Sequence, residues 1–188
     1  MKTSLGPRTL VYPHPVFLVG TYDAKDQPNI MAAAWSGICC SRPPCVAVSL
    51  RKATYSHGNI VLQKCFTLNI PSVALAKEAD YVGIYSGRDE NKFESTGLTP
   101  EKSTLVHAPY VKECPVVLEC KLAHTFELGL HTQFVGEILD VKADETILGE
   151  NGLPDIQKVM PLIYSSSDKG YYGVGKRVAD AFLVGKTK

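Results

Sequence analysis

The residues of this sequence that could do chemistry are basic and hydroxyl-bearing side chains, which suit the binding of an anion. Arg51, Thr54 and Ser56 lie close together in the chain, and Ser86 and Lys92 follow later. Arginine, lysine and hydroxyl groups form charge-assisted hydrogen bonds to phosphate oxygens. Thr54 and Ser56 also open a predicted helix, whose free N-terminal amides favour an anion. The sequence therefore indicates a local anion site.

Patterns for other kinds of catalytic or metal site are missing from the sequence. The five histidines are scattered, the six cysteines lack the spacing of a zinc knuckle, and no Gly-x-Ser-x-Gly motif occurs. Gly173 and Gly175 begin like a dinucleotide-binding motif, but Val178 stands where the third glycine is needed. We therefore expect no bound metal and no nucleophilic hydrolase.

The balance of charges predicts no broad surface for nucleic acid or an anionic membrane. Lysine and arginine total 20 against 19 aspartate and glutamate, for a formal net charge of +1 over 188 residues. Sequence-independent binding to nucleic acid depends on an excess of basic groups. A chain of this length can bury its own core, so we expect residues 1–188 to form a single domain.

The six cysteines are expected to be buried thiols, because a chain of this length and apolar content does not need a disulfide framework. Cys39 and Cys40 are expected to pack in or beside the fold, with a redox role as the alternative. Prolines interrupt residues 1–20, which therefore predict neither a signal peptide nor a spanning helix. These features favour a cytoplasmic, reducing location.

Short apolar and β-branched runs between turn residues predict most of the secondary structure. The predicted strands are Val16–Tyr22, Ile30–Trp35, Cys45–Leu50 and Cys65–Ile70, together with an alternating segment at 116–126 and its partner at 131–141. Turn residues at 23–29 make the first two strands a hairpin, and Gly129 relieves the turn of the last two.

Helical patterns are fewer, and they predict helices at Ser56–Gln63, Ser72–Tyr81 and Lys176–Phe182, with a loop at 150–161. Strands and helices do not alternate regularly. A mainly β fold, in the form of a closed or nearly closed antiparallel barrel, is therefore favoured over a doubly wound sheet.

Taken in order, several short motifs resemble the flavin reductase-like family of FMN-binding split barrels, and above all its flavoredoxin branch. These motifs are Ala32–Gly37, Pro43–Pro44, Val48–Arg51 with Thr54–Tyr55, Phe66–Pro71, Ser86–Gly87 with Lys92–Phe93, Gly129–His131 with Phe134–Glu137, and Tyr171–Gly175 with Ala179–Phe182. The specificity lies in their succession along nearly the whole chain. The resemblance implies an antiparallel Greek-key split β-barrel, and a homodimer whose flavin site lies near the subunit contact.

Several of these motifs can be matched with a part of the FMN molecule that they would bind. Small residues ending at Ala34 would let the backbone approach the flavin ring, and main-chain groups near Gly37 and Leu50 would bond to its polar edge and ribityl chain. Burial of the ring yields only ~5 kcal/mol, whereas micromolar binding needs ~8 kcal/mol. The anion site must therefore hold the phosphate. The implied cofactor-binding residues are Ala34, Trp35, Ser36, Gly37, Ser49, Leu50, Arg51, Thr54, Tyr55, Ser56, Ser86, Gly87 and Lys92.

Trp35 and His131 have the most open roles. A lone tryptophan at a strand end is more often a core aromatic, and a histidine after a turn glycine more often faces solvent or completes a strand. In the resembling family, the equivalent histidine lies near the flavin and the incoming nicotinamide. We therefore expect an orienting role for His131, and no side chain is expected to act as a nucleophile.

The resemblance implies an oxidoreductase that passes electrons from NADH or NADPH through bound FMN to an acceptor. The alternative is a flavoredoxin-like carrier that holds FMN tightly, has no nicotinamide site and exchanges electrons with a partner protein. A third hypothesis is a flavin-free binding or scaffold barrel. NADH and NADPH stay open as co-substrates, and FMN stays open as a prosthetic group or a released product.

Overall fold

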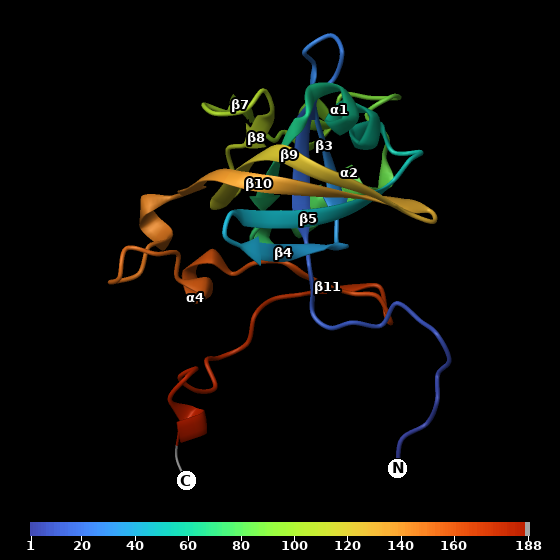
Figure 1. Ribbon diagram of the computed structural model, residues 1–188. Helices are drawn as coiled ribbons and strands as arrows, with labels where there is room; N and C mark the ends of the chain where they lie inside the picture. Colours follow the sequence, from blue (N-terminus) through green and yellow to red (C-terminus); the bar gives the residue numbers. More distant parts are fainter. Residues whose placement is uncertain (187–188) are drawn as a thin grey trace.

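The structure is a computed structural model that describes residues 1–186, and its main feature is one seven-stranded antiparallel sheet (Figure 1). Thr187 and Lys188 of the predicted domain lie outside the described residues. The strands of the sheet are β2 (Phe17–Tyr22), β3 (Pro28–Ala33), β4 (Ser36–Ser41), β5 (Pro44–Arg51), β6 (Cys65–Ile70), β9 (Val116–Leu128) and β10 (His131–Ala143). Their spatial order is β3-β2-β6-β9-β10-β5-β4. The predicted mainly β class is confirmed.

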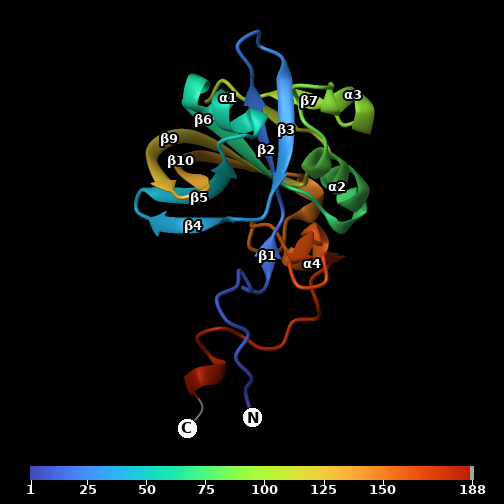
Figure 2. The same ribbon diagram turned by 90° about the vertical axis from the view of Figure 1, so that its right-hand side faces the viewer.

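The two edges of this sheet come together at one seam. β3 and β4 are the edge strands, yet only Ala34 and Trp35 join them in the chain. So short a link spans at most about 11 Å, which forces the sheet to curl until its edges approach each other (Figure 2). At the seam, the backbone N–H of Ser49 donates a hydrogen bond of 2.9 Å to the carbonyl of Trp35.

Smaller elements flank the large sheet. A three-stranded sheet contains β1 (His14–Pro15), β11 (Ile163–Ser165) and β12 (Gly170–Tyr172), and a separate pair contains β7 (Pro100–Lys102) and β8 (Pro109–Val111). The helices are α1 (Tyr55–Gln63), α2 (Ala76–Ile84), α3 (Lys92–Thr96) and α4 (Ile156–Val159), with 3-10 turns at Val73–Leu75, Glu145–Ile147 and Val184–Lys186. No helix in the described part of the chain has the length and apolar character needed to cross a membrane.

Two apolar cores hold these layers together. Phe66, Leu68 and Phe134 lie fully buried inside the curled sheet. A second cluster fills the space between β3 and helix α2, where Ile30 packs with Val82 of the helix. The helix predicted at Ser72–Tyr81 is present as the 3-10 turn Val73–Leu75 followed by α2, and its burial against the sheet places α2 beside the seam (Figure 2).

Both predicted hairpins are confirmed. β2 and β3 pair in register, and their turn is closed by the Asp23 carboxylate, which accepts hydrogen bonds from the backbone of Lys25 at 2.7 Å and Gln27 at 2.9 Å. β9 and β10 pair across a turn in which Gly129 has φ +56°. Glycine adopts this left-handed conformation without steric cost, which explains its place in the turn.

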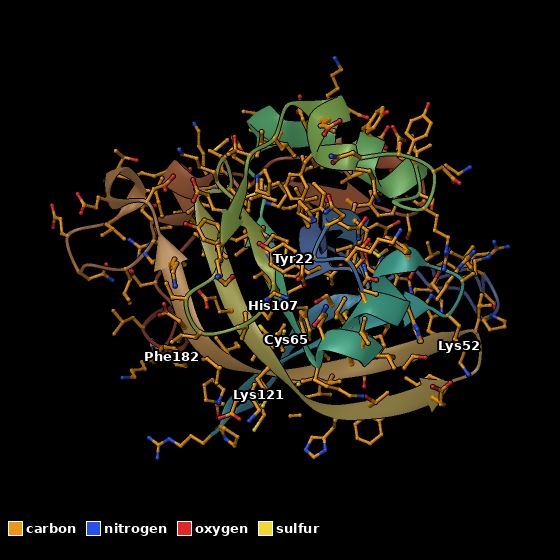
Figure 3. The ribbon with its side chains drawn as sticks, turned by 90° about the horizontal axis from the view of Figure 1, so that it is seen from above. Tyr22, Lys52, Cys65, His107, Lys121 and Phe182 are labelled. Carbon is orange, nitrogen blue, oxygen red and sulfur yellow. The ribbon has the colours of Figure 1, made fainter. Side chains whose placement is uncertain are left out.

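The tip of the β2–β3 hairpin is tied to the loop between β7 and β8. The His107 ring lies 4.9 Å from the Tyr22 ring, and its Nε2 is 2.8 Å from the Asp26 carboxylate (Figure 3). The Cys65 thiol donates to the His107 carbonyl at 3.3 Å. These contacts fix the end of the barrel that lies away from the chain termini (Figures 1 and 3).

Two predicted elements near the C-terminus are wrong. Residues 176–182 form no helix, because Val178 and Phe182 are almost fully exposed and a short helix without apolar burial is unstable in water. The predicted loop at 150–161 contains α4, which begins where the Asp155 carboxylate accepts a hydrogen bond of 2.9 Å from the backbone of Gln157.

The prediction of buried thiols holds for four of the six cysteines. Cys45, Cys65, Cys114 and Cys120 are buried, whereas Cys39 and Cys40 are exposed. The expectation of buried thiols is therefore wrong for these two. They lie on β4, which pairs with β5 and forms one edge of the large sheet.

Candidate functional site

A cavity of about 490 Å³ lies at the seam where the sheet edges meet. Its walls come from the end of β3 and the following residues 34–35, the end of β5 with Thr54, the start of β10, helix α2, and the small sheet that contains β11 and β12. Its volume falls within the range of about 300–1,000 Å³ that is typical of small-molecule and cofactor sites. The curling of the sheet therefore builds a site of the right size from segments far apart in sequence.

One part of the cavity lining is apolar. It consists of Met31, Ala32, Ala33 and Ala34, and Gly83 of α2 lies so close that a Cβ at this position would be 3.3 Å from the Cβ of Ala32. The alanines and the glycine project little from the backbone. An aromatic ring could therefore approach the backbone here to van der Waals distance.

Stacked aromatic rings form a second wall. The Trp35 ring is nearly parallel to two imidazoles: His14 at 5.5 Å with an interplanar angle of 11°, and His131 at 6.5 Å with an angle of 8°. Tyr164 and Tyr171 extend this wall, with ring centroids 5.8 Å apart. Trp35 is 41% exposed, so it is not the core aromatic that would be usual for a lone tryptophan.

Two cations line the same cavity. Arg51 stands at the end of β5, directly opposite His131 of β10, and Lys169 lies in the turn between β11 and β12. Among the described residues, neither side chain forms an ion pair with a carboxylate. Because Asp80 is the one carboxylate that the described residues contribute to the same lining, the two cations leave the cavity with a net positive charge.

Thr54 and Asp80 complete the polar part of the lining. The Thr54 hydroxyl donates to the Arg51 carbonyl at 2.9 Å, and it makes no capping bond to helix α1. The Asp80 carboxylate accepts a hydrogen bond of 3.1 Å from the Tyr171 hydroxyl. Burial, together with this bond to Asp80, raises the pKa of Tyr171 to about 12, so the hydroxyl stays a donor near neutral pH.

The structure brings seven of the sequence-predicted site residues into this cavity. They are Ala34, Trp35, Ser49, Leu50, Arg51, Thr54 and His131. The backbone N–H of Ser49 is already used by Trp35, so it is not free for a ligand. The others combine the apolar wall, the aromatic stack and the positive charge in one place.

Several other predicted residues lie outside the cavity lining. Ser36 and Gly37 belong to β4, where the Ser36 hydroxyl donates to the Ala47 carbonyl at 2.7 Å. Ser56 is buried and accepts a hydrogen bond of 2.8 Å from the Asn29 amide. These side chains bond within the protein, and their positions do not support direct ligand contact.

Lys92 is the predicted residue whose placement differs most from expectation. Its side chain is buried, with 4% of the residue exposed, and its Nζ donates to the Val82 carbonyl at 2.9 Å. Burial lowers the pKa of this ammonium to about 8. Lys92 therefore joins α3 to α2, and its placement does not support the predicted contact to a phosphate.

The remaining predicted residues surround a smaller hollow of about 290 Å³ beside α1. Tyr55 and Gly87 line it, and the Arg88 guanidinium lies 5.4 Å from the centroid of the Tyr55 ring. Ser86 closes the neighbouring turn by accepting from the backbone of Arg88 at 3.2 Å. The buried Asn29 Oδ1 has no hydrogen-bond partner among the described residues.

Sequence reasoning missed several residues of the cavity. Lys169, Tyr164 and Asp80 carry no motif, and the first two come from the small sheet or its turn, whose strands have only two or three residues each. Such strands are too short for a hydrophobic period to be detected. Among the described residues, no three His, Cys, Asp or Glu side chains gather in a way that could hold a metal.

Comparison with known proteins gives a consistent result. Residues 8–173 match the family model described as the flavin reductase like domain. The chain is also similar to a solved structure of flavoredoxin from Desulfovibrio vulgaris (Miyazaki F), with 58% sequence identity and a TM-score of 0.95 over 99% of this chain and 100% of that chain.

Two further solved structures extend the similarity. A flavoredoxin from Methanosarcina acetivorans has 33% identity and a TM-score of 0.92 over 99% of this chain and 98% of that chain. A putative flavin reductase with a split barrel domain from Shewanella frigidimarina has 25% identity and a TM-score of 0.85 over 97% of this chain and 99% of that chain. The predicted split β-barrel is confirmed by these matches.

Proposed function

This chain belongs to the flavin reductase-like family, and from that premise we propose that it is an FMN-binding oxidoreductase that takes electrons from NADH or NADPH and passes them to an acceptor. The observation that carries the proposal is the combination, in one cavity, of small apolar residues, stacked aromatic rings and two cations that form no ion pair with a carboxylate among the described residues. A planar ring that carries a phosphate has matching surfaces. When bound, FMN would supply the hydride and electron transfer that amino-acid side chains cannot.

The residues present fit this group by their chemistry. The small side chains of Ala32–Ala34 would lie against the ring, and Trp35 and His131 would border it. Arg51 would hold the phosphate together with the Thr54 hydroxyl at the start of α1, where free backbone amides favour an anion. We assign His131 an orienting role toward flavin and nicotinamide, and we assign no nucleophile.

We also propose that residues 1–188 form one domain that acts as a homodimer in the cytoplasm. Leu128 lies opposite His131, and Phe126 lies opposite Gln133, so both share the sheet face that carries His131. Each is about half exposed, and exposed apolar patches next to a site mark interfaces. Free thiols at all six cysteines support a reducing compartment.

The alternative is an electron carrier that holds FMN, lacks a nicotinamide site and exchanges electrons with a partner protein. Two of the solved structures similar to this chain are named flavoredoxin, which supports the carrier as a second candidate function. Stopped-flow mixing of the anaerobic flavin-loaded protein with NADH and with NADPH separates the two functions. Loss of the flavin absorbance with either nucleotide supports the reductase, and absence of any change with both excludes it in favour of the carrier.

A further inference from the structure

Lys169 lines the cavity although no sequence motif marks it. It occupies the turn between β11 and β12, where its backbone has φ +56°, in the left-handed region that favours glycine. The neighbouring Asp168 carboxylate holds this turn by accepting hydrogen bonds from the backbone of Gly170, at 3.2 Å, and from the Tyr172 hydroxyl. The fold therefore keeps a lysine in an unfavourable conformation at a fixed place in the wall.

The charges around Lys169 make the cavity suited to a second contact with an anion. Arg51 enters from the end of β5, and Lys169 enters from a different wall. Asp80 is the carboxylate of the lining, and it is engaged by the Tyr171 hydroxyl at 3.1 Å. Because the two cations outnumber this one carboxylate, an anion that binds near them is stabilised.

The position of Lys92 does not support the predicted lysine contact to a phosphate, and Lys169 can supply that contact. A phosphate carries nearly two negative charges at neutral pH, so one arginine neutralises only part of it. The Lys92 ammonium is buried and donates to the Val82 carbonyl, whereas Lys169 is exposed to the cavity. Of the lysines in the described residues, Lys169 is the one in the cavity lining.

We propose that Lys169 is an anion-binding residue of this cavity and contacts a phosphate group of a bound aromatic nucleotide. The inference rests on the proposed function, since that function supplies the nucleotide. Two sources share the required chemistry: the phosphate of FMN and the diphosphate of the incoming NADH or NADPH. A charge-assisted hydrogen bond contributes about 1.5–3 kcal/mol, which corresponds to roughly 10- to 150-fold in affinity.

The test compares Lys169→Gln with Lys169→Arg and with the control Lys102→Gln. Lys102 lies on β7, outside the cavity lining. Binding of FMN and of riboflavin to flavin-free protein is measured by flavin fluorescence. Binding of NAD⁺ and NADP⁺ to the FMN-loaded protein is measured from the change in flavin absorbance. Lys169→Gln should weaken at least one phosphate-bearing ligand tenfold or more, while Lys169→Arg and Lys102→Gln stay within twofold of the wild type.

The pattern of losses identifies the source of the phosphate. A loss for FMN without a matching loss for riboflavin assigns Lys169 to the flavin phosphate, and a loss for the dinucleotides alone assigns it to their diphosphate. Equal losses for FMN and riboflavin with unchanged dinucleotide binding, or no loss at all, would overturn the inference. Wild-type protein that binds neither flavin would instead overturn the proposed function, and the inference with it.

Discussion

The indole ring of Trp35 lies nearly parallel to the imidazole of His131, with ring centroids 6.5 Å apart and planes inclined by 8°. His14 is also stacked on the indole, with ring centroids 5.5 Å apart and planes inclined by 11°. These two ring contacts restrict the orientation of the indole at the edge of the cavity before any ligand arrives. A site organised in advance loses less conformational entropy on binding.

Replacing Trp35 with alanine should weaken FMN binding about tenfold, because aromatic contacts of this kind contribute about 0.5–1.5 kcal/mol beyond their area. Trp35 is 41% exposed, so the melting temperature without ligand should change little. Isothermal titration of FMN measures the first effect and calorimetry the second. Trp35→Phe is the matched control and should keep most of the affinity. An alanine variant that binds FMN like the wild type would remove Trp35 from the site.

Replacing Arg51 with glutamine should weaken FMN at least tenfold more than riboflavin, which lacks the phosphate. The reason is the loss of a charge-assisted bond that only FMN can make. Fluorescence titration with both ligands gives the ratio directly. Lys112 is exposed and lies outside the cavity, so Lys112→Gln serves as the control. Equal weakening of the two ligands would show that Arg51 does not contact the phosphate.

The buried Lys92 predicts a specific dependence of stability on pH. Its pKa is about 8 in the folded protein and 10.5 when unperturbed, so between these values the unfolded chain binds more protons. Stability contributed by this group should therefore rise as pH increases from 8 to 10.5, by up to about 3 kcal/mol. Urea unfolding of wild type and Lys92→Met across this pH range measures the contribution of Lys92 to the free energy of unfolding. A difference between the two proteins that does not vary with pH would contradict the assignment.

The buried Glu119 carboxylate is expected to be essential for stability. It is fully buried, pairs with Lys142, and accepts from the backbone of Leu105 at 2.7 Å. Burial raises the pKa of Glu119, but these bonds outweigh burial and lower it overall. Glu119→Gln should cost about 3 kcal/mol, because the buried side chain loses its charge-assisted hydrogen bonds from Leu105 and Lys142, although Lys142 keeps its ion pair with Asp140.

Chemical denaturation of Glu119→Gln at neutral pH measures this loss. The exposed Glu101, whose carboxylate is 3.6 Å from the Lys112 ammonium, offers a matched control. Glu101→Gln should cost less than about 1 kcal/mol, as is usual for surface ion pairs. Similar stability of the two variants would refute the structural role given to Glu119.

The large sheet was predictable because its strands carry strong local signals. β6 matches its predicted range of Cys65–Ile70. The strand predicted at 116–126 is present as β9, but the predicted alternation of buried and exposed residues is wrong, because residues 116–120 are all buried, Glu119 included, and Phe126 is half exposed. β4 escaped prediction, since Ile38, Cys39 and Cys40 are exposed on both faces of an edge strand and show no alternation. Burial against a partner element, which creates a periodic pattern, is absent there.

The site was predictable only where it lies on these strands. Arg51 and His131 stand at ends of strands in the large sheet, Trp35 lies in the two-residue link between β3 and β4, and all three belong to motifs of the sequence. Lys169 depends on a turn in a small sheet, which local sequence does not reveal. The placement of Lys92 could not be predicted from its motif. A motif identifies the residue but does not show whether its ammonium faces the cavity or the Val82 carbonyl.

The central claim is that the cavity at the seam binds FMN, and Trp35, the single tryptophan of the chain, provides its most direct test. Flavin-free protein is titrated with FMN while tryptophan emission is recorded. The account predicts saturable quenching that ends at one FMN per chain, with a dissociation constant in the micromolar range or tighter. Emission that stays unchanged up to millimolar FMN would contradict it.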